Sequence, residues 1–250
     1  MPKATNGQGH RSQTGGCPKR PVRDNDAMCG RFAQPRSSEE LAQIFRARPV
    51  VEIPGDRFNV APTDEVAAVV EHHGERVIEP FRWGLVPVYE ETPKKAARLI
   101  NARAETIETS PAFRTAFASR RLIVPADAFY EWYRGGGRPQ PFAVRRRDGE
   151  PLALAGVWAV WRDPETAERL YTCSIVTTVP NELVAPIHNR MPVILDPHDW
   201  DAWLAVSTPL PDLRLLLFPL PPELLDAYPV SLAVNSVRSA GPELLAPMSG

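Results

Sequence analysis

Short runs of β-branched and aromatic residues fill most of the chain after residue 65, and Gly, Pro or Asp separates each run from the next. Such runs, bounded by turn-forming residues, are typical of β-strands. The chain is therefore expected to be built mainly from strands. They are predicted at residues 66–70, 76–83, 121–124, 129–133, 141–147, 152–161, 170–178 and 192–195.

Helical signals are fewer and shorter. The sequence SSEE at residues 37–40, followed by Leu41, Ile44 and Phe45, predicts a capped amphipathic helix that stops near Pro49. Further short helices are predicted at residues 111–118, 181–185, 197–204 and 211–217. The chain has no visible repeat and no regular β-helix-β alternation, which disfavours a doubly wound parallel sheet. We expect an α+β fold: a single domain with a mainly antiparallel, barrel-like mixed β-sheet and short flanking helices.

Residues 1–28 differ from the rest in composition. They are rich in Gly, Pro, Asn, Lys and Arg and have almost no large apolar residue, so they are expected to form a disordered leader before a domain over residues 29–250. The leader lacks the apolar stretch of a secretory signal, and no later run approaches the ~20 apolar residues of a membrane span. A soluble cytoplasmic protein is predicted.

Charge and cysteine content exclude some classes of function. Residues 29–250 carry 24 basic and 28 acidic residues, net −4, so bulk electrostatics do not predict a nucleic-acid binder, and any DNA contact would need a local Arg cluster. The three cysteines, Cys17, Cys29 and Cys173, are too few and too scattered for a disulfide framework or a zinc site. No metal or cofactor is expected.

Cys29, in the sequence MCGRF (28–32), carries the most specific chemistry. If the residues before it are removed, it has a thiol and a free amine on neighbouring carbons. The amine condenses with an aldehyde to a Schiff base, and the thiol then closes a five-membered thiazolidine ring. An unperturbed α-amine has a pKa of about 7.7 to 8, so part of it is nucleophilic at neutral pH. The alternative is a buried structural cysteine in a strand.

Two further residues are candidate acid–base groups. Glu131, in FYEWY (129–133), shares a strand face with Phe129 and Tyr133, where burial would raise the pKa of its carboxyl. His188 lies in a loop-like segment, and loops on rigid scaffolds often carry catalytic groups. The alternative for Glu131 is an exposed side chain paired with an arginine. The alternative for His188 is an ordinary surface histidine.

Two more segments offer groups for recognition. INARAET (100–106) places an amide, Asn101, and a guanidinium, Arg103, next to each other, and its alternative is a helix N-cap. Trp83 in RWGLVP (82–87) would present an indole face for an exposed base, or else pack in the core.

Together these segments resemble the SRAP family, the SOS-response-associated peptidase-like proteins, which crosslink to abasic sites in single-stranded DNA. The resemblance runs from Met28 to about Pro247. It rests on the order of MCGRF, RFNVAPT (57–63), RWGLVP, INARAET, FYEW, IHNRMPVIL (187–195), NSV (235–237) and GPELLAP (241–247). Each motif alone is weak, but their joint occurrence in this order is specific.

The resemblance implies roles for individual residues. It makes Cys29 the crosslinking residue, Asn101 the group that holds its amine, Glu131 the acid–base that opens the abasic sugar, and His188 a hydrogen-bond partner of the sugar. The remaining assignments are residues that line the DNA channel (Arg31, Trp83, Arg103 and Arg190) and residues that shape the pocket (Asn59, Pro62 and Thr177). The resemblance further implies a monomeric protein whose partner is single-stranded DNA with abasic sites. It would be associated with the nucleoid when bound to DNA and would have no membrane partner.

The chain departs from the family at its start. Members usually begin Met-Cys, whereas 27 residues precede Met28 here. Either translation starts at Met28, or the leader is a propeptide removed before Cys29, or the extension is real and the protein works differently. The propeptide would fit a self-processing peptidase that cuts before Cys29. Two other functions stay open: a thiol peptidase using Cys29 and His188 on itself or other proteins, and a single-strand-binding module without catalysis.

Overall fold

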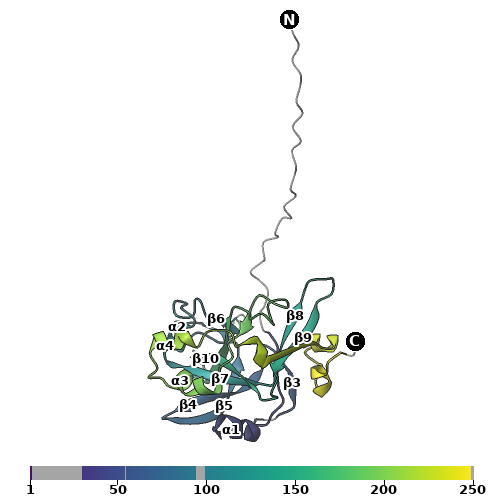
Figure 1. Ribbon diagram of the computed structural model, residues 1–250. Coiled ribbons are helices and arrows are strands. Elements are labelled where there is room, and N and C mark those ends of the chain that lie inside the picture. The colour runs from purple at the N-terminus through teal and green to yellow at the C-terminus, as the bar shows by residue number, and fades with distance from the viewer. Residues whose placement is uncertain (2–29, 54, 94–98, 249–250) are drawn as a thin grey trace.

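The computed structural model of the 250-residue chain describes residues 1, 30–53, 55–93 and 99–248 (Figure 1). Cys29, Cys17 and, apart from Met1, the leader predicted over residues 1–28 lie outside the described residues. The predictions made for these residues are therefore not addressed by the structure.

Five strands close into a ring. Their order is β11-β10-β7-β4-β5, and β5 returns to β11. The closing pair is parallel, with Thr172 opposite Arg82 and Cys173 opposite Trp83, and the other four pairings are antiparallel. The mainly antiparallel, barrel-like mixed sheet predicted from the sequence is confirmed. The bounds are β4 (Glu65–His72), β5 (Glu75–Trp83), β7 (Arg121–Ala126), β10 (Leu152–Arg162) and β11 (Arg169–Thr178).

Short strands extend this ring. β2 (Arg48–Pro49) pairs with β5, while β6 (Asn101–Arg103) and β12 (Met191–Pro192) both pair with β11. β6 runs parallel to β11 and β12 antiparallel to it. Segments distant in the sequence, after residue 100 and after residue 190, are thereby brought to the same strand.

A second, antiparallel sheet stands beside the ring in the order β13-β9-β8-β1-β3. The Gln34 side chain joins the two sheets: its amide donates to Ala67 O and Pro125 O at 2.9 and 2.7 Å and accepts from Ala67 N–H at 2.9 Å. The strands of the second sheet are β1 (Phe32–Gln34), β3 (Arg57–Val60), β8 (Ala128–Tyr133), β9 (Gln140–Arg146) and β13 (Leu225–Pro229).

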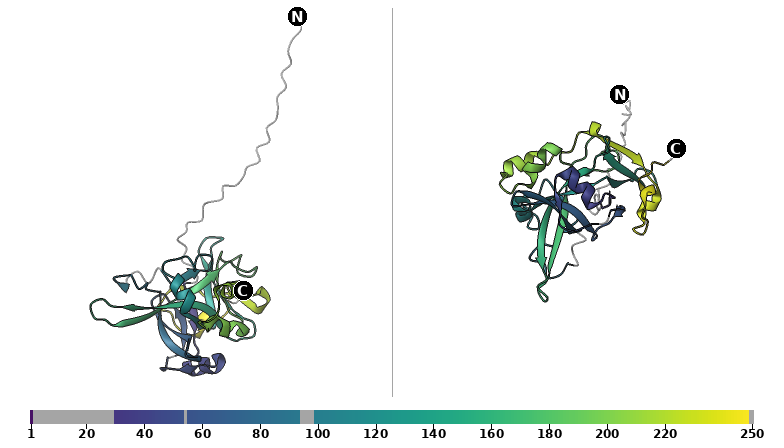
Figure 2. Two further views of the ribbon diagram at one scale, coloured as in Figure 1. Left: turned by 90° about the vertical axis from the view of Figure 1, so that its left-hand side faces the viewer. Right: turned by 90° about the horizontal axis from the view of Figure 1, so that it is seen from below.

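The helices are short and lie at the periphery (Figure 2). The predicted capping box of the first helix is confirmed, because the Ser37 hydroxyl accepts from Glu40 N–H and the Glu40 carboxylate accepts from Ser37 N–H. The helices are α1 (Ser38–Phe45), α2 (Arg114–Ser119), α3 (Trp200–Leu204) and α4 (Leu210–Leu215), with 3₁₀ turns η2 (Pro197–Asp199), η3 (Pro222–Leu224), η4 (Leu232–Asn235) and η5 (Pro242–Leu245). None of the helices within the described residues is long and apolar enough to cross a membrane.

One predicted helix is wrong. Residues 181–185 form consecutive turns rather than a helix. The Asn181 side-chain oxygen accepts from Val184 N–H at 3.0 Å, and Ala185 N–H donates to Asn181 O, as in a first helical turn. Pro186 then follows, and the residue before a proline is disfavoured in helical conformation. A second turn follows, in which Ile187 N–H and His188 N–H both donate to Val184 O, and it leads directly to His188.

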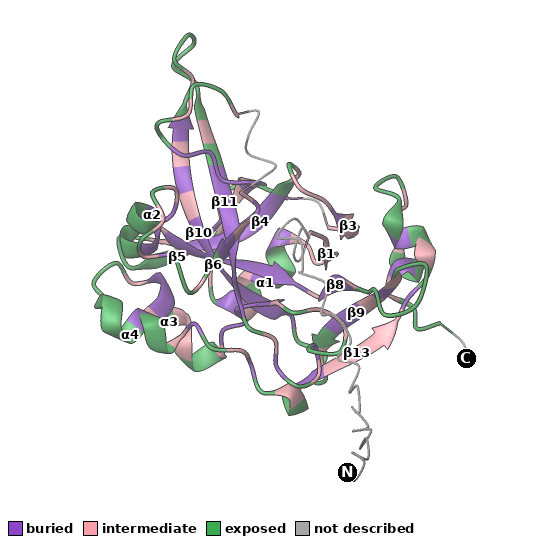
Figure 3. Cartoon of the chain, turned by 90° about the horizontal axis from the view of Figure 1, so that it is seen from above, coloured by how far each residue is buried: buried purple, intermediate pink, exposed green. Residues whose placement is uncertain are grey.

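The strands of the ring are buried on both faces (Figure 3). On β4, Val66, Ala68 and Val70 belong to one core cluster, while Ala67 and Val69 belong to a second cluster that also includes residues of all four α-helices. Burial on both sides explains why these strands read as continuous apolar runs in the sequence.

Candidate active site

Glu131 is a buried carboxyl on the central part of β8. Its side chain is 2% exposed, and strand alternation turns it to the same side as Phe129, toward the ring. A carboxylate in such surroundings costs free energy unless a donor or a charge lies near. The alternative of an exposed, surface-paired Glu131 is therefore wrong.

His188 lies beside this carboxyl. Its Nδ1 lies 3.9 Å from Glu131 Oε1, and its side chain is 8% exposed. One bond holds its backbone and another its ring: His188 N–H donates to Val184 O at 2.9 Å, and Arg190 N–H donates to His188 Nδ1 at 3.2 Å. Two nearly buried ionisable side chains are thus held close together, one on a strand and one on a turn.

β6 brings the predicted recognition residues to the same edge. In its parallel pairing with β11, Asn101 stands opposite Ile175 and Arg103 opposite Thr177. Asn101 thus begins a strand rather than capping a helix. Arg103 is exposed, and Thr177 is fully buried.

Arg190 connects this edge to the histidine segment. Its Nη2 donates to Thr177 O at 2.6 Å, and its guanidinium forms a two-pronged ion pair with Glu105, in the turn after β6, with Nη2 at 2.9 Å from Oε2. The guanidinium lowers the pKa of the Glu105 carboxyl by hydrogen bonding to it. The structure therefore gathers Glu131, His188, Arg190 and Thr177, next to the strand of Asn101 and Arg103.

The chain just after Cys29 runs between Ile100 and β8. Arg31 O accepts from Tyr130 N–H at 2.9 Å, and the register of β1 on β8, extended by two residues, sets Gly30 opposite Glu131. A Cβ at Gly30 would lie 3.9 Å from Ile100 Cδ1. Gly30 thus sits between the residue before Asn101 and the strand of Glu131.

Arg31 and Asn59 lie on the other face of the second sheet and are not brought together with Glu131 and His188. Arg31 Nη1 donates to Asn59 Oδ1 at 2.8 Å and to Val234 O at 2.9 Å, and burial lowers the pKa of the guanidinium. Asn59 Nδ2 also donates to Ser236 O and Ser239 O, each at 2.9 Å. The two residues thereby fasten the C-terminal segment to the start of β1 and to β3.

Trp83 is a core residue. Its side chain is fully buried, its Nε1 donates to Ile100 O at 2.9 Å, and its ring packs edge-on against Phe32 at 5.0 Å. The expectation that Trp83 lines a DNA channel is corrected here, since a ring without exposed surface offers no face to a base. Pro62 lies half-buried in the turn after β3, where the next residue, Thr63, donates its N–H to Trp83 O.

Glu105 and the carbonyls of the C-terminal segment were missed as contributors to this region. Glu105 pairs with a residue 85 positions away, and Val234 is 203 positions from Arg31. Only INARAET and NSV marked these segments, and neither motif specifies a pairing partner.

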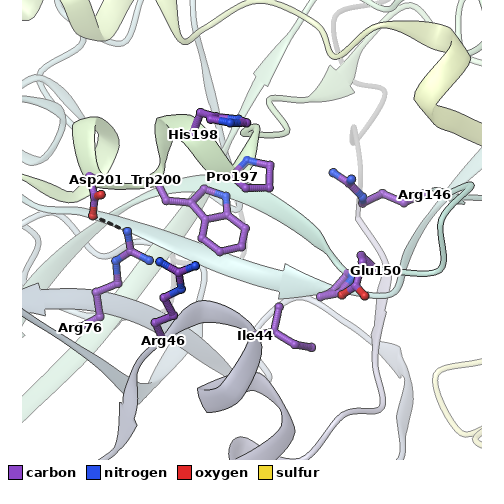
Figure 4. A pocket seen from close by; sticks show the side chains of 10 residues that line it. Ile44, Arg46, Arg76, Arg146, Glu150, Pro197, His198, Trp200 and Asp201 are labelled. Atoms are coloured by element: carbon purple, nitrogen blue, oxygen red, sulfur yellow. Dashed lines mark hydrogen bonds and ion pairs between the residues drawn. The ribbon is translucent and has the colours of Figure 1, made fainter.

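A separate cavity of about 610 Å³ lies beside α1 and α3 (Figure 4). Ile44, Arg46, Arg76, Trp200 and Asp201 are among its lining residues, and none of the lining residues belongs to the predicted site. Carboxylates compensate much of its basic charge: Arg76 is paired with Asp201, and Arg146 with Asp148. We assign no role to this cavity.

Comparison with known proteins gives a consistent result. A family model described as "SOS response associated peptidase (SRAP)" matches residues 28–237. The chain is similar to the "Abasic site processing protein YoqW" of Bacillus subtilis, with 37% identity over 223 residues that cover 87% of this chain and 99% of that protein. Similarity to the "Abasic site processing protein YedK" of Escherichia coli is 31% over 229 residues, covering 88% of this chain and 100% of that protein.

Solved structures agree with the sequence comparisons. A crystal structure of a protein from Bacteroides thetaiotaomicron superposes with a TM-score of 0.81 at 25% sequence identity, and the match covers 88% of this chain and 100% of that one. The structural similarity thus extends over most of the chain.

Proposed function

Because the chain belongs to the SOS response associated peptidase (SRAP) family, we propose that it processes abasic sites in DNA by capturing the sugar covalently through Cys29. The names of its relatives support the general activity, which is the processing of abasic sites in DNA. The covalent step is an inference from chemistry: Cys29 as an N-terminal residue is a 1,2-aminothiol, and the open form of an abasic sugar is an aldehyde.

The observation that carries this proposal is the buried pair of Glu131 and His188, 3.9 Å apart, beside the residue that follows Cys29. An abasic deoxyribose is mostly a closed hemiacetal. Opening it breaks the bond from C1′ to the ring oxygen, removes the proton of the C1′ hydroxyl and adds one to the ring oxygen. Glu131 is the group proposed to move these protons, and His188 is proposed to hydrogen-bond the sugar.

Covalent capture then proceeds in two steps. The Cys29 amine adds to C1′ and loses one water, which gives a Schiff base. The thiol adds to the carbon–nitrogen double bond and transfers its proton to nitrogen, which gives the thiazolidine. Asn101 is proposed to orient the amine. If ring closure fails, loss of a C2′ proton from the Schiff base expels the 3′ phosphate, so a weak lyase activity is part of the proposal.

Single-stranded DNA is the proposed partner, because an unpaired abasic sugar enters a pocket without the cost of unstacking. Arg103 and Arg190 are proposed to contact its phosphates, for which the planar guanidinium is well suited. Together they supply the local arginine cluster that the net charge of the domain does not.

A free Cys29 amine requires that nothing precede it. We propose that hydrolysis of the bond between Met28 and Cys29, with one water consumed, exposes the amine wherever a longer chain is made, and that Glu131 and His188 assist this step. A thiol peptidase acting on other proteins through Cys29 and His188 is the alternative. It needs no free α-amine, so a chain with residues still attached before Cys29 would turn over a peptide substrate.

Intact mass tests the proposal. The purified full chain is weighed before and after incubation with a single-stranded oligonucleotide containing one abasic site. We expect a chain that begins at Cys29 and gains the oligonucleotide mass less one water. Cys29→Ala should abolish the adduct, whereas Cys173→Ala, at a buried cysteine of β11, should preserve it. An adduct that survives in Cys29→Ala would overturn the proposal.

A further inference from the structure

The guanidinium of Arg190 holds an anion of the protein itself. Nη1 and Nη2 each donate to one oxygen of the Glu105 carboxylate, the second at 2.9 Å. A planar guanidinium presents the same pair of parallel donors to a carboxylate and to a phosphate. Glu105 therefore occupies the position on Arg190 that a phosphate group would take.

The two partners differ in exposure. The Arg190 side chain is 12% exposed, whereas that of Glu105 is 49% exposed and lies in a turn. Ion pairs with a solvent-exposed partner contribute little to stability, since water solvates the released carboxylate well. Arg103 also lies close enough to Glu105 to lower the pKa of its carboxyl, so a displaced carboxylate retains a cation nearby.

Arg190 stays in place without Glu105. Its Nη2 donates to Thr177 O at 2.6 Å, and its backbone N–H donates to His188 Nδ1 at 3.2 Å. These two bonds come from β11 and from the histidine turn, neither of which depends on the Glu105 side chain. Removal of the carboxylate would therefore leave an oriented guanidinium rather than a mobile one.

We propose that Glu105 is an exchangeable counter-ion of Arg190, which a phosphate of the bound DNA displaces, and that it thereby weakens and tunes DNA binding. This inference rests on the proposed function, because it takes DNA as the ligand of this edge. In the absence of DNA the carboxylate keeps the partly desolvated guanidinium satisfied. When DNA binds, its phosphate must replace the carboxylate of Glu105 on Arg190, so part of the binding free energy is used to break that ion pair.

A matched pair of variants separates this role from a general charge effect. Glu105→Gln removes one negative charge and breaks one carboxylate–arginine fork. Glu108→Gln does the same three residues later, where the Glu108 carboxylate is held by Arg214 Nε and Nη2 at 2.5 and 2.6 Å. Neither Glu108 nor Arg214 belongs to the site. The two variants therefore differ in which arginine they release.

The probe is a fluorescent single-stranded oligonucleotide with a tetrahydrofuran abasic analogue, which has no aldehyde and cannot crosslink, so equilibrium affinity is measured. We expect Glu105→Gln to bind roughly three- to ten-fold more tightly than the unaltered chain, and Glu108→Gln to stay within about two-fold of it. In an Arg190→Ala background, the gain from Glu105→Gln should disappear, because the cycle isolates the interaction between the two residues.

The outcomes separate the two proposals. If the unaltered chain crosslinks abasic DNA but Glu105→Gln binds the probe no more tightly than Glu108→Gln, the counter-ion inference is overturned and the proposed function stands. Weaker binding of the probe by Glu105→Gln would show that Glu105 holds Arg190 in the orientation that binds DNA, which also overturns the inference. A chain that neither crosslinks nor binds the probe overturns both.

Discussion

Glu131 Oε1 lies 3.9 Å from His188 Nδ1, and neither side chain is more than 8% exposed. At this separation and burial each side chain forms part of the surroundings of the other. A substitution at either position therefore also changes the environment of the other residue, so the effect of a single variant reports on the pair.

Glu131→Gln preserves the shape of the side chain and removes its proton chemistry. We expect crosslinking to an abasic oligonucleotide to slow by about 10²-fold or more, the usual effect of losing a general acid–base group, while affinity for the tetrahydrofuran probe is retained. Single-turnover crosslinking, followed by gel mobility, gives the rate. Glu150→Gln, at an exposed carboxyl beside the separate cavity, is the control and should leave the rate unchanged. An unaltered rate in Glu131→Gln would remove this residue from the mechanism.

Trp83→Phe distinguishes a core residue from a stacking platform. Loss of the hydrogen bond to Ile100 O and of part of the indole volume should lower the free energy of unfolding by about 2 kcal/mol, with no change in affinity for undamaged single-stranded DNA. Urea denaturation and fluorescence anisotropy measure the two quantities. Trp161→Phe is the matched control, because Trp161 is 4% exposed and its Nε1 donates to Glu90 O at 2.7 Å. Weaker DNA binding at unchanged stability, in Trp83→Phe alone, would restore the stacking role.

Asn59→Ala should loosen the C-terminal segment locally. The amide makes three hydrogen bonds of 2.8 to 2.9 Å, to Arg31, Ser236 and Ser239, and its loss frees the backbone on both sides of Arg238. We expect trypsin to cleave after Arg238 faster than in the unaltered chain. Asn181→Ala, which releases Leu220 O instead, should not accelerate this cleavage. Equal rates in the two variants would show that Asn59 does not hold the segment.

The Glu105–Arg190 pair predicts a pH-dependent contribution to stability. The folded-state pKa of Glu105 lies below its ordinary value because Arg190 hydrogen-bonds the carboxylate. Such a group stabilises the folded state above the unfolded pKa, about 4.3, and this contribution is lost as the pH falls through the lower folded-state value. The difference in melting temperature between the unaltered chain and Glu105→Gln should therefore be present at neutral pH and shrink below about pH 4. A difference that stays constant down to pH 3 would contradict this assignment.

Elements specified by neighbouring residues were predictable from the sequence. The α1 capping box lies within residues 37–40, and the strands of the ring carry long apolar runs because both of their faces are buried. Short strands were not predicted: β1, β3 and β6 have three or four residues each, and their conformation follows from pairing with distant strands.

The candidate site shows the same limit. Residue types and motif order pointed to Glu131 and His188, and the structure brings these two together. The burial of Trp83 was not predictable, because a tryptophan that follows an arginine in the sequence can face either the solvent or the core. The ion pair between Arg190 and Glu105 depends on the parallel pairing of β6 with β11. No local sequence pattern specifies that pairing.

The bond from Arg31 to Val234 spans 203 residues and joins the segment that follows Cys29 to one of the last segments of the chain. During synthesis Arg31 and its other partner, Asn59, leave the ribosome long before Val234 is made, so a nascent chain lacks this second acceptor for the guanidinium. The attachment of the segment that leads into β1 is therefore completed only when translation is nearly over. A chain that stops short of residue 234 would lack the Arg31–Val234 bond, so premature termination would leave the segment that leads into β1 incompletely attached.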